Sequence, residues 1–479
     1  MAEYLRPDVY VEEISTGEKP ISATSTSIGA FVGITARGPV GKPVFITSWS
    51  DFVKKFAEGL STPFMRTSDL ALAVYGFFKN GGSSCYVVRV PSSGMAKAQL
   101  DNDDFTITAK DEGEWGNNLK VKIEAQPKAS NLFKVTVELD GTVVEVFENV
   151  SNDAESDNFF GEVINPISKY IEIGVDEELE VISLTAFQGG AYSVASVSDS
   201  DFIGDKGLNA LDVAEDVSMV AVPGKTSDAI VKAVLDYATN RGDCFGIVDA
   251  PLSYDFDAEA ITTFREKLSG NGAMYYPWGK VVDPLSKNGS LRACPPSGHV
   301  MGIFSRTDKD RGVHKAPAGE EAVVRGFVEL CVKLTPNHVD LLNPKGINCI
   351  VAKPNKGIIV WGARSVNPDP AKRYVSDVRY DLMIKKSLYE GTQWAIFEPN
   401  DALLLDRVTT SLASFLDLQW RNGALLGNEP EQAYYVKCDE ELNDDASRNS
   451  GMLIAEVGYA KKKPAEFVII RIVQKSQSE

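Results

Sequence analysis

Hydrophobic and polar positions alternate with two different periods along this chain. The apolar runs at 27–35 and 42–48 are short and favour strands, whereas the apolar positions of 68–82 recur at helical spacing. Gly81 ends this helix as a C-cap. A further apolar run follows it, so the order of elements predicts an α/β segment over residues 21–98.

The pattern changes to strict alternation between about 99 and 195. Four stretches with period two are separated by turn residues, which is typical of half-buried strands. The sequence LDGT at 139–142 lies between two of them, and Asp-Gly favours a tight hairpin turn. These residues therefore predict an inserted antiparallel β module, with the Asp- and Ser-rich stretch 149–158 as a surface loop.

Strand and helix patterns alternate from 196 to 356. A strand that ends at Val222 is followed by a helix and then by a second strand at 244–250. This βαβ unit implies a parallel pair with a right-handed crossover. The apolar positions on one face of its helix are Ala229, Ile230, Ala233, Val234 and Tyr237.

The stretch 357–463 predicts an α+β domain. A helix is expected near 376–391, and a longer helix begins at Asp401 as N-cap and ends at Gly423. The sequence QWAIFE at 393–398, between these helices, favours a strand. Further strand patterns follow the second helix.

Both ends of the chain carry a short strand pattern beyond a breaker. At the N-terminus, residues 1–20 contain PDVYVEEI, and at the C-terminus residues 464–479 contain EFVIIRIV. The second strand is apolar on both faces, which is typical of the middle of a sheet. Chain ends are usually exposed, so this strand must find a sheet to join.

The composition limits the class of protein. The chain has 479 residues, 43% of them hydrophobic and 24% charged, as in globular proteins that bury large cores. A net charge of −18 argues against general nucleic-acid binding and against adsorption to an anionic membrane. The N-terminal region shows neither a secretory signal nor a membrane span. The six scattered cysteines indicate reduced thiols, as in a cytosol.

Motifs for nucleotide and metal chemistry are incomplete. PGKTSD at 223–228 follows a strand, but Met219 occupies the position at which a phosphate loop needs glycine. His299, His314 and His338 are the three histidines, and none has a partner at metal-ligand spacing. We therefore expect no cofactor and no metal.

The segment ACPPSGHVMGI at 293–303 resembles the serine-bearing helix start of subtilisin-type proteases. With His299 aligned, Cys294 occupies the nucleophile position. Every histidine follows Cys294, whereas the base and the orienting acid of subtilisins precede the nucleophile. We expect this helix start without peptidase activity, and His299 as a packed structural residue.

Nine stretches, in the same order, resemble contractile tail sheath proteins of bacteriophages, R-type pyocins and extracellular contractile injection systems. They span nearly the whole chain and include TSIGAFVGITARGPVGKP, PPSGHVMGIFSRTDKDRGVHKAPAGEE, YDLMIKKSLYEGTQWAIFEPND and GMLIAEVGYAKKKPAEFVIIRI. The resemblance implies an α/β and α+β multidomain fold. Residues 196–356 would form a catalytically dead subtilisin-like α/β domain, and 357–463 the C-terminal α+β sheath domain.

By this resemblance, residues 1–20 and 464–479 are arms that add strands to the C-terminal sheets of neighbouring subunits. KKKP at 461–464 would be the hinge of the second arm. The residues expected to link subunits are Val9, Tyr10, Val11, Glu12, Ile14, Phe467, Val468, Ile469, Ile470, Arg471, Ile472 and Val473. The candidate contacts to an inner tube are Arg379, Lys385, Lys386, Arg407 and Arg421, for which an ordinary solvated helix face is the alternative.

The function that this resemblance implies is structural. Subunits would polymerise as stacked hexameric rings around an inner tube and contract to drive the tube through a target envelope. Expected partners are further copies, the inner tube protein, and baseplate and terminator or cap proteins, without nucleic acid or direct membrane insertion. Assembly is expected in the bacterial cytoplasm, into a virion tail or a contractile injection particle. A non-contractile tail or shell protein and a subtilisin-like hydrolase are the alternatives.

Overall fold

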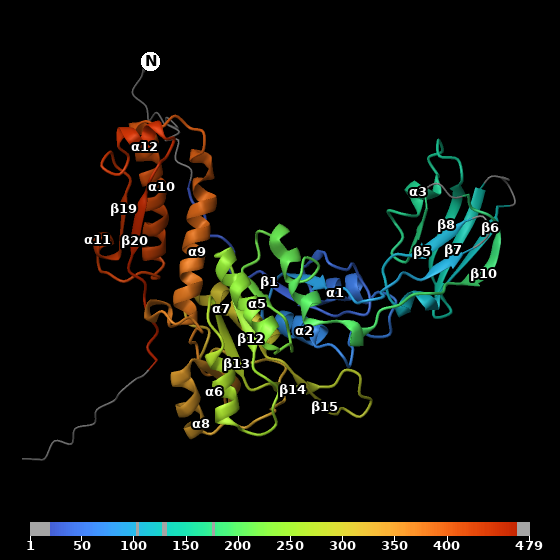
Figure 1. Ribbon diagram of the computed structural model, residues 1–479, viewed down its shortest axis with the longest axis horizontal. Helices are drawn as coiled ribbons and strands as arrows, with labels where there is room; N and C mark the ends of the chain where they lie inside the picture. Colours follow the sequence, from blue (N-terminus) through green and yellow to red (C-terminus); the bar gives the residue numbers. More distant parts are fainter. Residues whose placement is uncertain (1–19, 102–104, 127–131, 175–177, 467–479) are drawn as a thin grey trace, which may run out of the picture. The chain divides into compact units, whose positions relative to one another are not determined.

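The computed structural model describes residues 20–101, 105–126, 132–174 and 178–466. The chain forms two compact units (Figure 1). The larger unit contains residues 25–379, and the C-terminal unit contains the described residues up to Thr24 and from Tyr380 onward.

An eight-stranded sheet is the centre of the larger unit. Its six inner strands pair in parallel, and the strand at each edge is antiparallel to its neighbour. Strands from 21–98 and from 196–356 therefore share one sheet, joined where Gly29 pairs with Met219. In spatial order the strands are β18 (Gly357–Val360), β17 (Ile347–Lys353), β13 (Gly272–Tyr276), β12 (Phe245–Asp249), β11 (Met219–Ala221), β1 (Gly29–Gly33), β3 (Cys85–Arg89) and β2 (Pro43–Ile46).

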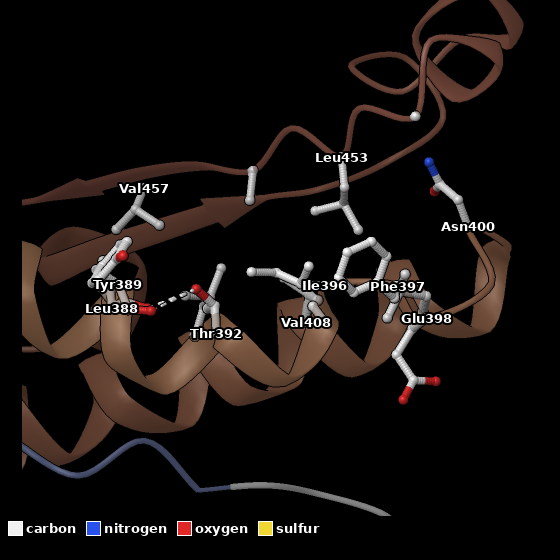
Figure 2. Close-up of a pocket in the computed structure, with 15 residues that line it drawn as sticks. Leu388, Tyr389, Thr392, Ile396, Phe397, Glu398, Asn400, Val408, Leu453 and Val457 are labelled. Carbon is white, nitrogen blue, oxygen red and sulfur yellow. Dashed lines mark hydrogen bonds between the residues drawn. The ribbon is translucent and has the colours of Figure 1, made fainter.

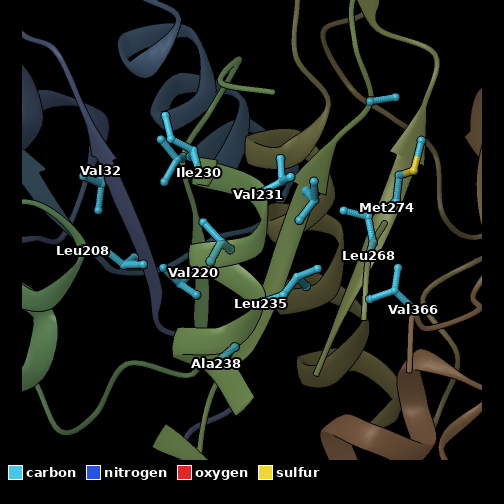
Figure 3. Packing of buried hydrophobic residues seen from close by; sticks show 14 of the residues in the cluster. Val32, Leu208, Val220, Ile230, Val231, Leu235, Ala238, Leu268, Met274 and Val366 are labelled. Atoms are coloured by element: carbon cyan, nitrogen blue, oxygen red, sulfur yellow. The ribbon is translucent and has the colours of Figure 1, made fainter. Parts of the chain in front are cut away.

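Helices cover both faces of this sheet. On β1, successive side chains point to opposite faces: Phe31 meets Phe77 of α2 at 5.6 Å between ring centroids, whereas Val32 belongs to the cluster that includes Ile230 of α5. Figure 3 shows Ile230, Val231 and Leu235 of α5 packed beside the strands. The helices are α1 (Trp49–Phe56), α2 (Leu70–Asn80), α4 (Asp199–Ile203), α5 (Asp228–Arg241), α6 (Ala258–Glu266), α7 (Ser297–Arg311) and α8 (Pro336–Leu342).

Local signals in the sequence explain these elements. Gly81 adopts φ +115° and caps α2, as expected. The predicted βαβ unit is confirmed, because β11 and β12 are parallel and α5 connects them. A small sheet lies alongside in the order β15 (Leu291–Cys294), β14 (Gly279–Val282), β16 (Glu329–Leu330). The short 3-10 helices are η2 (Val194–Ser196), η3 (Leu208–Val213), η4 (Asn343–Lys345) and η5 (Pro370–Lys372).

The predicted antiparallel strands form two further sheets within the larger unit. The expected hairpin turn is confirmed, because Asp140 and Gly141 have φ +51° and +79°. The first sheet has the order β10 (Ile182–Ala186), β6 (Leu119–Ala125), β7 (Leu132–Leu139), β8 (Thr142–Ser151). The second has the order β4 (Gln99–Asp101), β5 (Thr106–Ala109), β9 (Ile171–Ile173), and α3 (Phe160–Val163) and η1 (Glu114–Asn118) accompany them.

The C-terminal unit contains two long helices and a two-stranded sheet. Asp401 caps the second helix by accepting a hydrogen bond from the Leu404 amide at 2.9 Å. Gly423 follows this helix at φ +77°, directly after the C-cap residue Asn422. The elements are α9 (Val375–Thr392), which enters this unit at Tyr380, then η6 (Gln393–Ala395), α10 (Ala402–Arg421), α11 (Pro430–Ala433), β19 (Tyr434–Lys437), α12 (Asp445–Asn449) and β20 (Glu456–Tyr459).

The strand predicted at 393–398 is wrong. Residues Gln393–Ala395 form a 3-10 turn, and Phe397 adopts φ +66°, which an extended strand cannot contain. These residues connect two long helices, so the chain must reverse direction here. The apolar run resembled a strand because its residues form the rim of a groove instead of the inside of a helix.

Candidate functional site

The residues expected in the two arms lie outside the described residues. This applies to Val9, Tyr10, Val11, Glu12, Ile14 and to Phe467, Val468, Ile469, Ile470, Arg471, Ile472 and Val473. Their contacts stay predictions.

A large groove lies in the C-terminal unit, and we name it the C-terminal groove. Its volume is about 760 Å³. Figure 2 shows Leu453 facing Ile396 and Val408 across this space. The residues that line it are Leu388, Tyr389, Thr392, Ala395, Ile396, Phe397, Glu398, Asn400, Leu404, Val408, Leu412, Gly451, Leu453, Ala455 and Val457.

The groove exists because the apolar faces of two helices are covered by very little sheet. Leu404, Val408 and Leu412 recur every four residues on α10 and turn the same face toward the groove. Within the described part of the chain, β19 and β20 pair only with each other. None of their eight residues is buried. A two-stranded sheet is marginal on its own and leaves backbone groups unpaired at its edges.

The rim of the groove exposes large apolar side chains. Tyr389 is 68% exposed and Ile396 is 55% exposed, and Phe397 is fully exposed. Phe397 also has positive φ, which is unfavourable for a residue with a bulky side chain. An apolar cluster of this kind on a folded unit indicates a contact surface.

One buried polar atom in the groove lining has no partner. Asn400 donates from Nδ2 to the Met452 carbonyl at 2.9 Å, while its Oδ1 is buried without a hydrogen bond. Buried acceptors are nearly always satisfied in native proteins. Asn400 Oδ1 can therefore accept a backbone N–H from a segment that enters the groove.

Arg379 must be withdrawn from the candidate tube contacts. Its side chain is 3% exposed and belongs to the larger unit. Both guanidinium nitrogens donate to the Asp308 carboxylate, at 2.9 and 2.6 Å, and one also donates to the Thr26 carbonyl at 2.8 Å. The guanidinium lies over the Phe304 ring at 4.7 Å. A buried bidentate pair of this kind is an internal contact.

The other four candidate cations lie on the helices of the C-terminal unit. Lys385 is exposed and Lys386 is partly buried on α9. Arg407 lies over Trp394 at 4.7 Å and 3.9 Å from Glu398, and Arg421 pairs with Asp417 at 2.7 Å. Arg407 and Arg421 therefore have partners within their own unit, and contact with a tube stays a prediction for all four cations.

The segment 293–303 carries a buried cysteine and a buried histidine. Cys294 ends β15 with no exposed surface, and burial raises the pKa of its thiol well above the usual value. The ring of His299 on α7 packs at a tilt against Phe327, with 4.3 Å between the ring centroids, and burial, followed by the nearby charge of Lys79, lowers its pKa to about 3. His299 is a packed residue, as expected. Neither group is suited to nucleophilic or base chemistry near neutral pH.

Asp249 is a buried acid that the sequence analysis missed. It ends β12 and accepts hydrogen bonds from the Gly224 amide at 3.0 Å and from the amide and hydroxyl of Ser297, each at 2.8 Å. Burial raises its pKa to about 6, although these hydrogen bonds act in the opposite direction. Asp249 thus joins the turn at 223–225 to the start of α7. Its position, as an acidic residue at the end of a strand that is buried throughout, could have identified Asp249.

Among the residues that the structure describes, no group of three or more His, Cys, Asp or Glu side chains is arranged to hold a metal ion. Among the described helices, none combines the length and the hydropathy needed to cross a membrane.

Two family models match adjacent parts of the chain. The phage tail sheath protein central domain matches residues 203–366, and the phage tail sheath C-terminal domain matches residues 367–475. The tail sheath protein of Vibrio phage KVP40 is 24% identical over 400 residues, which cover 76% of this chain and 58% of that protein. The tail sheath protein of Salmonella phage ViI is 22% identical over 327 residues, which cover 64% and 49%. The chain thus spans about half the length of these curated relatives.

Solved structures share the fold over a longer part of the chain. A sheath complex of the extracellular contractile injection system PVC, in its contracted state, matches with a TM-score of 0.61 and 20% identity, over 99% of both chains. The sheath tail protein of Desulfitobacterium hafniense matches with a TM-score of 0.62 and 14% identity, over 90% and 94%.

Together with the fold, these matches define a mixed α/β structural protein of the tail sheath class. The chain belongs to the phage contractile tail sheath family.

Proposed function

We propose that this chain is the structural subunit of a contractile tail sheath. The observation that carries the proposal is the uncovered C-terminal groove beside a two-stranded sheet, in the unit that the sheath C-terminal domain model matches. Copies polymerise as stacked hexameric rings around an inner tube. On contraction they re-pack and drive the tube through a target envelope, and the difference between two packings supplies the energy.

The occupant that we propose for the C-terminal groove is an arm of a neighbouring copy. Residues 467–473 are apolar on both faces. One face would pack on the apolar side chains of α10, and the backbone would extend the sheet of β19 and β20. The unpaired Asn400 Oδ1 and the exposed Phe397 supply one polar and one apolar contact for the incoming strand.

The further partners belong to the same proposal. Lys385, Lys386, Arg407 and Arg421 are candidates for ionic contact with the inner tube, and baseplate and cap proteins would hold the two ends of the sheath. Assembly would take place in the bacterial cytoplasm, in a virion tail or a contractile injection particle. The subunit would lack subtilisin-like hydrolase activity, because Cys294 at the nucleophile position is buried and burial raises the pKa of its thiol.

Electron microscopy of the purified chain tests this proposal. The full chain and a chain that ends at Ala465 are compared for sheath-like tubes, with circular dichroism as the check of folding. A chain that ends at Lys475 is the matched control, because it keeps residues 467–473 and loses only the last four residues. We expect tubes from the full chain and the control, and a folded subunit without tubes from the chain ending at Ala465. Normal tubes from that shorter chain would refute the role of the arm.

Co-expression with an inner tube protein distinguishes the non-contractile alternative. In electron micrographs a contractile sheath forms two populations of particles that differ in length and diameter, whereas a passive shell forms one population. Labelling with thiol-directed and serine-directed probes tests the hydrolase alternative, and we expect none at Cys294.

A further inference from the structure

The residues that precede the predicted C-terminal arm are attached to α9. We name residues 459–463 the C-terminal root. The Asp381 carboxylate on α9 accepts a hydrogen bond from the Tyr459 hydroxyl at 2.8 Å. It also forms an ion pair with Lys461 Nζ at 2.5 Å. The side chains of Asp381 and Lys461 are only 17% and 18% exposed.

Backbone contacts fix the C-terminal root as far as Lys462. Leu426 donates to the Ala460 carbonyl at 2.7 Å, and Lys461 forms a bridge with Leu425. KKKP is therefore not a free hinge over its whole length, because its first residue is held by Asp381. Burial and the charge of Asp381 raise the pKa of Tyr459, so its hydroxyl stays protonated and keeps donating at neutral pH.

The residues that follow the predicted N-terminal arm contact the same helix. We name residues 20–24 the N-terminal root. The Thr24 amide donates to Ser387 Oγ at 3.0 Å, and this fully buried hydroxyl donates in turn to the Met383 carbonyl at 2.7 Å. Ile21 packs on the bare backbone of Gly391, where an added Cβ would lie 2.5 Å from its side chain.

We propose that α9 is the common attachment of both arms, so that tension between two neighbouring subunits passes through this one helix. The inference rests on the proposed function. Positions 381 and 391 are about 15 Å apart along the helix axis at about 1.5 Å per residue. A pull on the C-terminal arm reaches α9 through Tyr459 and Lys461, and it leaves α9 through Ser387 and Gly391.

The alternative route for this tension is weak. Without Asp381 the pull would act on the few backbone bonds that join residues 460–462 to residues 424–426, and on the two-stranded sheet of β19 and β20, which contains four residue pairs. The bonds to Asp381 are charge-assisted and partly buried, which makes them stronger than a neutral contact. Asp381 is therefore a positioning residue that joins the C-terminal root to the helix.

Shear of assembled sheaths tests the inference. Sheaths of the full chain and of Asp381→Ala are passed through a narrow capillary, and their lengths are measured by electron microscopy. We expect fragments of Asp381→Ala that are several-fold shorter than those of the unchanged chain. Glu441→Ala is the matched control, because it removes an exposed ion pair with Lys437 in the same unit, and we expect no change.

A double variant separates one route from two. Ser387→Ala removes the acceptor of the Thr24 amide without adding bulk. If both roots act in series through α9, sheaths of the double variant Asp381→Ala with Ser387→Ala give fragments as short as those of the weaker single variant, and no shorter. If the two attachments were independent, the reductions in fragment length caused by the two single variants would multiply in the double variant, and that result would overturn the inference.

Hydrogen exchange of the unassembled subunit keeps the test independent of sheath formation. We expect faster amide exchange at 459–462 in Asp381→Ala and at 21–24 in Ser387→Ala. Unchanged exchange at both roots would overturn the inference even if sheaths form. Failure of the proposed function is a different result, namely no tubes from the full chain while both roots respond as expected.

Discussion

The described residues of the larger unit build a broad sheet covered by helices, whereas those of the C-terminal unit build only two paired strands beside an open groove. Every residue of β1, β12 and β13 is buried, and helices lie on both faces of these strands. In β19 and β20 no residue is buried, and the helices beside them line an open groove of about 760 Å³. The difference teaches that substitutions in the first region should change stability, while substitutions in the second should change assembly.

The largest effect on stability is expected from Gly298→Ala in the larger unit. An added Cβ at this helical position would overlap the backbone oxygen of Ala73 on α2. Because backbone cannot move aside as a side chain can, α2 and α7 would have to separate. We expect a loss of about 3 kcal/mol or more in the free energy of unfolding, measured with urea.

Gly94→Ala is the control for this prediction. Gly94 has φ +73° and no atom near its missing Cβ, so alanine meets only backbone strain there. The expected cost is about 1 kcal/mol. Equal losses at Gly94 and Gly298 would show that the two helices are not closely packed.

Two buried groups are expected to make the stability of the larger unit depend on pH, and acid acts on stability in opposite directions through them. His299 has a folded pKa of about 3, so its unfolded form binds a proton more readily and stability falls as pH drops below 6.5. The folded pKa of Asp249 is raised to about 6, so its contribution is present at low pH and is lost as pH rises through 6. Between pH 7 and pH 4 the contribution amounts to about 3 kcal/mol for His299 and about 2 kcal/mol for Asp249.

Two variants resolve these opposing contributions. We expect His299→Gln to be less sensitive to acid than the unchanged chain and Asp249→Asn to be more sensitive. The measurement is the urea midpoint at pH 4, 5 and 7, and the slopes against pH are compared because each variant also changes stability at neutral pH. Slopes equal to that of the unchanged chain would mean that neither group titrates as its burial implies.

Patterns within short stretches predicted the larger unit well. The helix α5 was expected from its apolar face, and β11 and β12 from the buried runs beside it. The pairing of Gly29 with Met219 was not predicted, because a contact between residues 190 positions apart leaves no periodic signal. The two α/β segments of the sequence analysis therefore contribute to a single sheet.

Arg379 and Phe397 show where sequence patterns failed. A positive charge on a helix is usually solvated, and the pairing of Arg379 with Asp308, 71 residues away, has no local signal. Phe397 lies in an apolar run that favours a strand, yet its backbone turns to positive φ between two helices. The groove itself could not be predicted, because it depends on how α9, α10 and β20 pack.

Phe397→Asn is expected to separate stability from assembly in the C-terminal unit. Asparagine tolerates positive φ better than phenylalanine, and the lost ring is fully exposed. We expect the subunit to gain up to about 1 kcal/mol in unfolding free energy. Assembly should become weaker, measured as a higher critical concentration for tubes, because an apolar contact in the groove is lost.

Tyr254→Asn in the larger unit is the control, because Tyr254 is also a largely exposed aromatic side chain. It should leave the critical concentration unchanged. If both variants impair assembly equally, exposed aromatics in general, and not the C-terminal groove, would be responsible.

The smallest effect on stability is expected at the exposed cations. Arg421 pairs with Asp417 across one helical turn, and such surface pairs contribute about 0.5 kcal/mol or less. Arg421→Ala should therefore leave the melting temperature nearly unchanged.

If Arg421 also contacts the inner tube, tube retention by the sheath should fall and should become more sensitive to salt, which screens such contacts. Arg311→Ala is the matched control, because Arg311 forms a similar exposed pair with Glu321 at 2.6 Å in the larger unit. Equal loss of tube retention in both variants would indicate an effect of net charge, whereas loss in Arg421→Ala alone would place the contact on the C-terminal unit.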